Sequence, residues 1–261
     1  MHHSRKPSLI WVIAVGALMA FALSASASDR DQFTEEFHRT VPLSADGRIS
    51  LHNINGGVTI TGWERNEVQI DAVKKADSQQ KLQEATIEVE SSSNSVDIRT
   101  KYPEGRNHNN PASVTYELHV PRTARLDGIN LVNGSLTISQ FGGEVRAELV
   151  NGSSTIHDLA GRTEISSVNG SVQAFYSSLE NVKEVRLKSV NGAVKLGLPS
   201  SPNADVSVST VNGGISTDFP LTVEGKFMSH HIDGKLGSGG TRIEISNVNG
   251  SEHIGRGEGA L

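Results

Sequence analysis

A single tripeptide, Val-Asn-Gly, recurs through the second half of the chain and constrains the fold more than any other feature. It occurs six times, and Ile232-Asp233-Gly234 fills the one long gap between its copies. Counted from one Asn to the next, with Asp233 in the gap, the steps are 18, 18, 22, 21, 21 and 16 residues. Short β-rich segments that repeat with this period are typical of a β-solenoid, in which each repeat adds one coil.

The residues around each Asn form columns when the repeats are aligned. Positions six and four before the Asn, and three after it, are mostly apolar, so each coil sends one period-two set of side chains inward. The intervening positions carry charges. Seven residues before the Asn the column reads Glu144, Arg162, Glu184, Asp205, Lys226 and Arg242, and five before it the first three repeats read Arg146, Glu164 and Arg186.

These charged columns predict the register of the strands. Opposite charges on neighbouring strands attract, whereas like charges directly opposite each other repel. We therefore expect Arg146, Glu164 and Arg186 to point outward from consecutive coils. The same is expected of Glu144, Arg162 and Glu184.

The Asn-Gly pair is explained by turn chemistry, because Gly and Asn tolerate positive φ. Stacked Asn side chains can also hydrogen-bond from coil to coil. We expect such a ladder at Asn55, Asn133, Asn151, Asn169, Asn191, Asn212, Asp233 and Asn249. The Val before each Asn is expected to pack at a corner of the core. Four Asn-Gly-Ser sites match the glycosylation pattern, and we interpret these matches as by-products of the turns.

Residues 1–27 resemble a secretory signal peptide. Arg5 and Lys6 precede an apolar run from Leu9 to Leu23, and Ala25-Ser26-Ala27 provides small residues for cleavage. The alternative is an uncleaved anchor, but the run is shorter than the roughly 20 residues that span a bilayer. We expect the mature chain to begin near Ser28 and not to insert into a membrane after cleavage.

The mature chain divides into an N-terminal β cap (28–125), a β-solenoid of Asn-Gly repeats (126–255) and a tail (256–261). The cap contains a first coil around Asn55, followed by alternating strand-like segments with longer connections. Asp77 or Ser78 can cap a short helix that runs through Gln83 or Glu84. Tyr102 to Pro111 is expected to be a loop.

Composition excludes several classes of function. The chain has no cysteine, so it forms no disulfides and has no thiolate chemistry. Its formal charge of −5 becomes −7 when Arg5 and Lys6 leave with the signal peptide. An acidic chain without a Lys/Arg cluster argues against binding to nucleic acid or to anionic membrane surfaces. Aromatic residues make up 5% of the chain, which suits coils filled with Val, Ile and Leu.

Three segments give the chain a resemblance to a known family. They are Gly47 to Trp63, with Asn-Gly-Gly-Val-x-Ile-x-Gly-Trp, Tyr116 to Pro121, with Tyr-x-Leu-x-Val-Pro, and the repeated Asn-Gly-x-Val. Together they resemble the bacterial putative-adhesin family of β-strand-repeat proteins, a domain of unknown function. The resemblance covers nearly all of the mature chain. It implies an exported parallel β-solenoid or a close relative, and it supplies no catalytic residue.

Catalytic, cofactor-binding and metal-binding residues are not indicated by any motif. The histidines are scattered, and the one adjacent pair in the mature chain, His230-His231, is expected to point to opposite faces of a strand. No Ser stands in Gly-x-Ser-x-Gly. We therefore predict no cofactor, no metal and no enzymatic activity.

An alternative, enzymatic interpretation rests on Glu184 and Asp205. If sequential coils stack, these two acids lie on adjacent coils about 5 Å apart, close to the separation in a retaining glycosidase. The alternative is a polysaccharide lyase or glycoside hydrolase that acts on an outer face. The main prediction is an all-β, exported, adhesin-like binding or scaffold protein of the periplasm or cell surface. Its partner would be an envelope protein or a glycan.

Overall fold

The computed structural model describes residues 33–103, 112–223 and 231–257. The chain divides into two compact units, Met1–Arg30 and Asp31–Leu261, and the description that follows concerns the second. The predicted signal peptide and cleavage site lie outside the described residues, as do most of the predicted loop from Tyr102 to Pro111 and of the tail.

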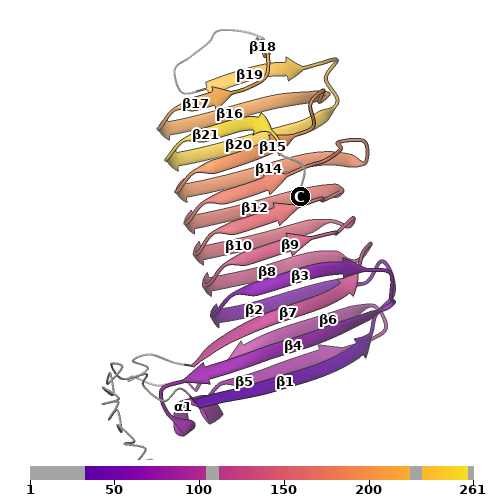
Figure 1. Cartoon of the computed structure of the whole chain (residues 1–261), viewed down its shortest axis with the longest axis vertical. Helices are drawn as coiled ribbons and strands as arrows, with labels where there is room; N and C mark the ends of the chain where they lie inside the picture. The colour runs from indigo at the N-terminus through magenta and orange to yellow at the C-terminus, as the bar shows by residue number, and fades with distance from the viewer. Residues whose placement is uncertain (1–32, 104–111, 224–230, 258–261) are drawn as a thin grey trace, which may run out of the picture. The chain divides into compact units, whose positions relative to one another are not determined.

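The described residues form an all-β structure of two large sheets (Figure 1). Sheet A has ten strands in the spatial order β1 (Phe33–Pro42), β4 (Glu67–Ala76), β7 (Ser113–Pro121), β3 (Val58–Trp63), β9 (Leu136–Ser139), β11 (Ser154–His157), β13 (Val172–Phe175), β15 (Val194–Leu198), β21 (Glu252–Arg256) and β17 (Ile215–Thr217). Sheet B has eleven, in the order β18 (Thr222–Val223), β19 (His231–Leu236), β16 (Ala204–Asn212), β20 (Thr241–Asn249), β14 (Val182–Asn191), β12 (Gly161–Asn169), β10 (Val145–Asn151), β8 (Arg125–Asn133), β2 (Arg48–Asn55), β6 (Ser95–Lys101) and β5 (Thr86–Ser91).

Each Asn-Gly turn joins a strand of sheet B to a strand of sheet A, and we call the two strands a strand pair. Within a pair, alternate residues are buried, as Val145 and Ala147 are in β10 and Ile156 is in β11. The buried sets of both sheets form one apolar cluster. Pairs of the repeat region stack in parallel, because each pair buries the same columns as its neighbours.

The predicted register is confirmed for the charged columns. Arg146 lies opposite Glu164, and Glu164 lies opposite Arg186. Arg162 likewise lies opposite Glu184. Glu144 directly precedes β10, so it stands outside the paired residues of that strand.

The spatial order of the strands departs from their order in the sequence at both ends. The last pair, β20/β21, lies between β14/β15 and β16/β17, and the first pair, β2/β3, lies between β6/β7 and β8/β9 (Figure 1). The expectation that coils stack in sequence order is therefore wrong for β20/β21, whereas β2/β3 does stack on β8/β9, the next Asn-Gly pair in the sequence. As a result, Arg242 of β20 lies between Glu184 and Asp205 and opposite both.

Asp233 is not at a turn of the ladder, which corrects its predicted place. It lies inside β19, which runs antiparallel to β16 and places Asp233 opposite Ser207. An antiparallel strand reverses the direction of the repeat, so the Ile-Asp-Gly triplet cannot occupy the corner that the Val-Asn-Gly triplets occupy. The column residue Lys226, assigned to the same repeat, lies outside the described residues.

The N-terminal cap adds antiparallel strands to both sheets. In sheet A, β1 pairs with β4 and β4 with β7, and in sheet B, β5 pairs with β6. The predicted short helix is present as α1 (Gln79–Glu84), and the Ser78 side chain caps it by accepting from the Lys81 backbone N–H. The half-exposed Glu35 of β1 pairs with the buried ammonium group of Lys74 at 2.7 Å, which links β1 to β4.

Candidate binding surface

A continuous ladder of Asn side chains runs along the turn edge of sheet B. The spatial order of the ladder is Asn55, Asn133, Asn151, Asn169, Asn191, Asn249 and Asn212, and from Asn133 onward each Nδ2 donates to the Oδ1 of the Asn before it at 2.8 to 3.0 Å. The ladder therefore follows the stacking of the strand pairs and not the sequence. It crosses the inserted pair without a break.

The glycine after each Asn is required by close stacking. A Cβ at Gly152 would overlap the carbonyl oxygen of Gly134, and a Cβ at Gly170 would overlap that of Gly152. The ladder Asn residues do not themselves have positive φ, since Gln140 and Asp158 are the non-glycine residues with positive φ in the described ranges. Close approach of the turns, more than backbone freedom at Asn, thus explains the Asn-Gly pair.

The apolar residue before each ladder Asn is exposed, which corrects the prediction that it packs in the core. Counting back from Asn, the inward positions are two, four and six, so the residue one before Asn belongs to the outward set. We call this row the apolar stripe. Its members are Ile54, Val132, Val150, Val168, Val190, Val248 and Val211, each between 38% and 60% exposed.

Charged side chains occupy the outer face of sheet B farther from the turn edge. Arg186 is the centre of this network: it pairs with Glu244 at 3.0 Å, with Glu184 at 2.9 Å and more loosely with Glu164 at 3.9 Å. Its hydrogen bond to Glu244 raises the pKa of Arg186 above the usual value. Arg162 also pairs with Glu184, at 2.9 Å.

The alternation of charge follows the spatial order of the strands. The charged row farthest from the turn edge lies seven residues before each ladder Asn. Across β12, β14, β20, β16 and β19 this row and its partner on β19 read Arg162, Glu184, Arg242, Asp205 and Lys235. Glu184 and Asp205 are therefore two strands apart, with a cation between them. This removes the adjacent carboxylates on which the enzymatic alternative depended.

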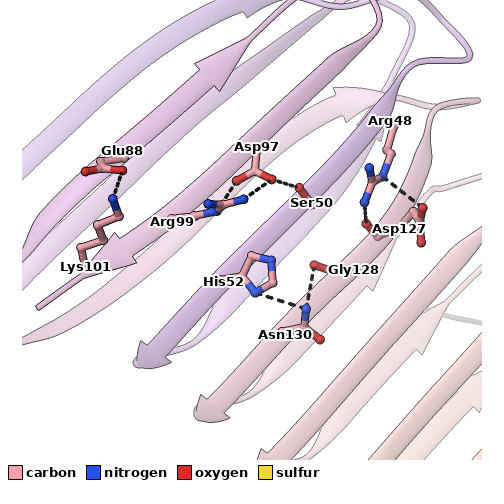
Figure 2. A network of polar contacts seen from close by, with 10 residues as sticks. All are labelled: Arg48, Ser50, His52, Glu88, Asp97, Arg99, Lys101, Asp127, Gly128 and Asn130. Atoms are coloured by element: carbon pink, nitrogen blue, oxygen red, sulfur yellow. Dashed lines mark hydrogen bonds and ion pairs between the residues drawn. The ribbon is translucent and has the colours of Figure 1, made fainter.

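A second polar network lies at the other end of the same face (Figure 2). Asp97 of β6 accepts from the Ser50 hydroxyl of β2 at 2.6 Å and pairs with Arg99 at 2.7 Å. Burial acts to raise the pKa of Asp97, but the hydrogen bonds from Ser50 and Arg99 outweigh it and leave the pKa below its usual value. Arg48 reaches across to Asp127 of β8 at 3.0 Å.

A hollow of about 230 Å³ opens on this face beside β8, β10 and β12. Besides Leu126 and Val145, it is lined by three arginines and three acids, and these are Arg125, Arg146, Arg162, Asp127, Glu144 and Glu164. The lining is balanced in charge and offers both donors and acceptors. Such a surface suits a polar ligand rather than a strongly charged one.

One titratable residue in the interior was missed by the sequence analysis. Glu252 of β21 is fully buried between Val194 and Ile215 of the neighbouring strands, and neither carboxylate oxygen has a hydrogen-bond partner of acceptable geometry. Burial raises its pKa to about 7, against a smaller opposing contribution from the Thr210 hydroxyl. Its position, three residues after Asn249, was the available signal, because that column is otherwise mostly apolar.

Within the described ranges, no group of three or more His, Cys, Asp or Glu side chains is placed to hold a metal ion. No helix among the same residues is long and apolar enough to cross a membrane. His231 is hydrogen-bonded to Asp233 at 2.8 Å, whereas its neighbour His230 lies outside the described residues.

These features define an all-β protein of two large, mainly parallel sheets joined through Asn-Gly turns. No family model and no curated protein matches the sequence. Among solved structures, it is similar to a protein from Clostridium sporogenes described as a putative cell adhesion protein. The two are 15% identical, with a TM-score of 0.54 over 86% of this chain and 100% of that one.

Two further structures are similar at lower scores. A putative adhesin from Bacteroides fragilis is 12% identical, with a TM-score of 0.37 over 85% of this chain and 97% of the other. A putative lipid binding protein from Parabacteroides distasonis is 12% identical, with a TM-score of 0.31 over 85% and 96%. The Clostridium protein shares the fold of this chain, and the predicted resemblance to adhesin proteins is confirmed at that level.

Proposed function

We propose that this chain is an exported, non-enzymatic β-solenoid that acts as an adhesin-like binding or scaffold protein of the cell envelope. The observation that carries the proposal is the outer face of sheet B. Parallel strands repeat the same outward positions on it, which gives a broad surface of ordered polar and charged side chains. Binding surfaces on repeat proteins are built in this way.

The strand connections support the solenoid description. In the repeat region each strand pair passes once through sheet B and once through sheet A, and from β8/β9 to β14/β15 the next pair in the sequence stacks in parallel on it. The shared fold with the Clostridium protein supports an adhesin-like role. Export is supported by the sequence of residues 1–27, and it places the binding surface in the periplasm or at the cell surface.

We propose that the hollow beside β8, β10 and β12, whose lining has equal numbers of basic and acidic side chains, is the contact region for an envelope protein or a glycan. Its mixed donors and acceptors can bind hydroxyl, amide and carboxylate groups of such a partner. The charges of this face are largely paired within the chain, as Arg146 with Glu164 and Arg162 with Glu184. Such pairs favour recognition of a neutral or zwitterionic polar surface.

Export is tested by fractionation of cells that express the full-length chain, with mass spectrometry of its N-terminus. We expect an envelope fraction that begins near Ser28. An intact N-terminus in the cytoplasm would contradict the proposal.

Binding is tested by exposing the purified chain to envelope extracts and to a glycan panel. We expect capture of a defined protein or glycan that weakens in Arg125→Ala and not in Lys195→Ala, a control on the outer face of sheet A. The same panel tests for turnover. Release of cleaved polysaccharide that is lost in Glu184→Gln with Asp205→Asn would restore the enzymatic alternative.

A further inference from the structure

The apolar stripe stands apart from the rest of the surface. Among the described residues, eight large apolar side chains are exposed, and seven of them form this one row. The residues that flank each member are in register across β2, β8, β10, β12, β14, β20 and β16, so the seven side chains lie side by side. Stacking of β-branched side chains stabilises a sheet, yet it leaves each of these at least 38% exposed.

The stripe has a centre, and that centre is Val168. Its strand, β12, is the fourth of the seven, with three strands on each side. An antiparallel copy of the chain, related by a two-fold axis through Val168, would therefore place all seven apolar side chains against seven. Self-complementary surfaces of this kind are what two-fold dimers require.

The polar row next to the stripe has the same centre. This row, three residues before each ladder Asn, carries two formal charges in the repeat region, Glu148 on β10 and Lys188 on β14. They lie on either side of Ser166, two strand spacings or about 10 Å apart, which is too far for a direct ion pair. Neither side chain makes an ion pair or a hydrogen bond with another residue of the described ranges, in contrast to the paired charges of the next row.

We propose that the apolar stripe binds a second copy of this chain in an antiparallel, two-fold arrangement centred on Val168. The two-fold axis that gives full overlap of the stripes also brings Glu148 of each copy to Lys188 of the other. Two ion pairs form that neither copy can form alone. This inference rests on the geometry of the stripe and is independent of the proposed envelope partner.

The dimension of the stripe sets the strength of the dimer. Seven strands at about 4.8 Å give a stripe of about 29 Å, and the three residue steps from Glu148 to the Asn ladder span about 10 Å. The contact of roughly 290 Å² per copy is about a third of that in a standard stable complex. We therefore expect a weak, reversible dimer with a dissociation constant on the order of tens of micromolar or higher.

Sedimentation velocity over a concentration series tests the proposal, with the chain produced from Ser28 so that the compact unit from Asp31 is intact. We expect a monomer–dimer equilibrium. Val168→Glu, which sets two carboxylates against each other on the axis, should weaken it by about tenfold or more. Thr155→Glu, on the outward face of β11 in sheet A, is the control and should leave it unchanged.

A charge swap provides the sharper test. Glu148→Lys and Lys188→Glu should each weaken the dimer by placing like charges opposite each other, and the double variant should restore it. Both side chains are exposed, so far-UV circular dichroism and thermal midpoints should match the wild type. A chain that stays monomeric at every concentration overturns the proposal. So does a dimer that tolerates Val168→Glu, or a double variant as weak as the single ones.

Discussion

Glu252 makes the stability of this protein depend on pH, and the size of the effect follows from its burial. Its pKa rises from an ordinary value of 4.5 to about 7 in the folded chain. Each pKa unit corresponds to about 1.4 kcal/mol, so ionised Glu252 costs about 3 kcal/mol of folding free energy.

The direction of the change in stability with pH follows from which state, folded or unfolded, binds the proton more tightly. Below pH 4.5 Glu252 is protonated in both the folded and the unfolded chain and adds no pH dependence. Between pH 4.5 and 7 the folded chain holds the proton that the unfolded chain has lost, so stability falls as pH rises. Above pH 7 Glu252 is ionised in both states, so the full cost of burying its charge, about 3 kcal/mol, is present. The protein should be more stable near pH 5 than near pH 8 by this contribution.

Glu252→Gln removes the charge while keeping the shape of the side chain. At pH 8 the variant should be more stable than the wild type by up to about 3 kcal/mol, which corresponds to a thermal midpoint some 6 to 12 °C higher. At pH 5 the two should agree within about 1 kcal/mol. Glu252→Leu, which copies Leu136 of the same column, should show the same loss of pH dependence.

Thermal unfolding followed by circular dichroism between pH 4.5 and 8.5 measures these differences. Glu180→Gln is the matched control, because Glu180 is exposed and its loss should leave the pH profile intact. Parallel pH profiles for wild type and Glu252→Gln would refute the reasoning, since the buried carboxylate would then not be the group that titrates.

Three further predictions concern the stacking of the strand pairs. Asn169→Ala should cost about 1 kcal/mol more than Asn212→Ala in chemical denaturation, because Asn169 has ladder partners on both sides and Asn212 ends the ladder; equal costs would exclude the ladder as a source of stability. Gly152→Ala should destabilise by about 2 kcal/mol or more through overlap with the neighbouring turn, whereas Gly214→Ala, where a Cβ meets nothing within 4 Å, should be nearly neutral. Arg242→Glu places three acids in adjacent positions and should cost about 1 kcal/mol at low salt and less at high salt, and a salt-independent loss would argue against electrostatics.

The sequence predicts the repeat region well where chain order and spatial order agree. From β10 to β15 the columns specify the register, because one buried face fixes the phase of every strand. The insertion of β20/β21 was missed, although a signal for it existed. In sequence order Glu184 and Asp205 are like charges on adjacent repeats, and alternation is restored only when Arg242 is placed between them.

Other parts of the fold are harder to recognise from the sequence pattern. β1 is an edge strand whose side chains are mostly exposed, so Phe33–Pro42 lacks the alternation that identifies a half-buried strand. The antiparallel direction of β19 is not visible in its Ile-Asp-Gly triplet, which imitates a repeat turn. The exposure of Val132 and its equivalents did follow from period two, but the apolar character of the row favoured the core instead.

The insertion of the last strand pair has a consequence for how the protein is made. In an ordinary repeat array, a chain cut before its final repeat loses one layer from the end and keeps the rest. Here a chain cut after residue 240 would lose a layer from within the stack and leave β14/β15 and β16/β17 without the neighbour that joins them. Synthesis must therefore reach Arg256 before the stack can close. A chain that lacks β20/β21 keeps open sheet edges on β14, β15, β16 and β17, and addition of this pair covers them.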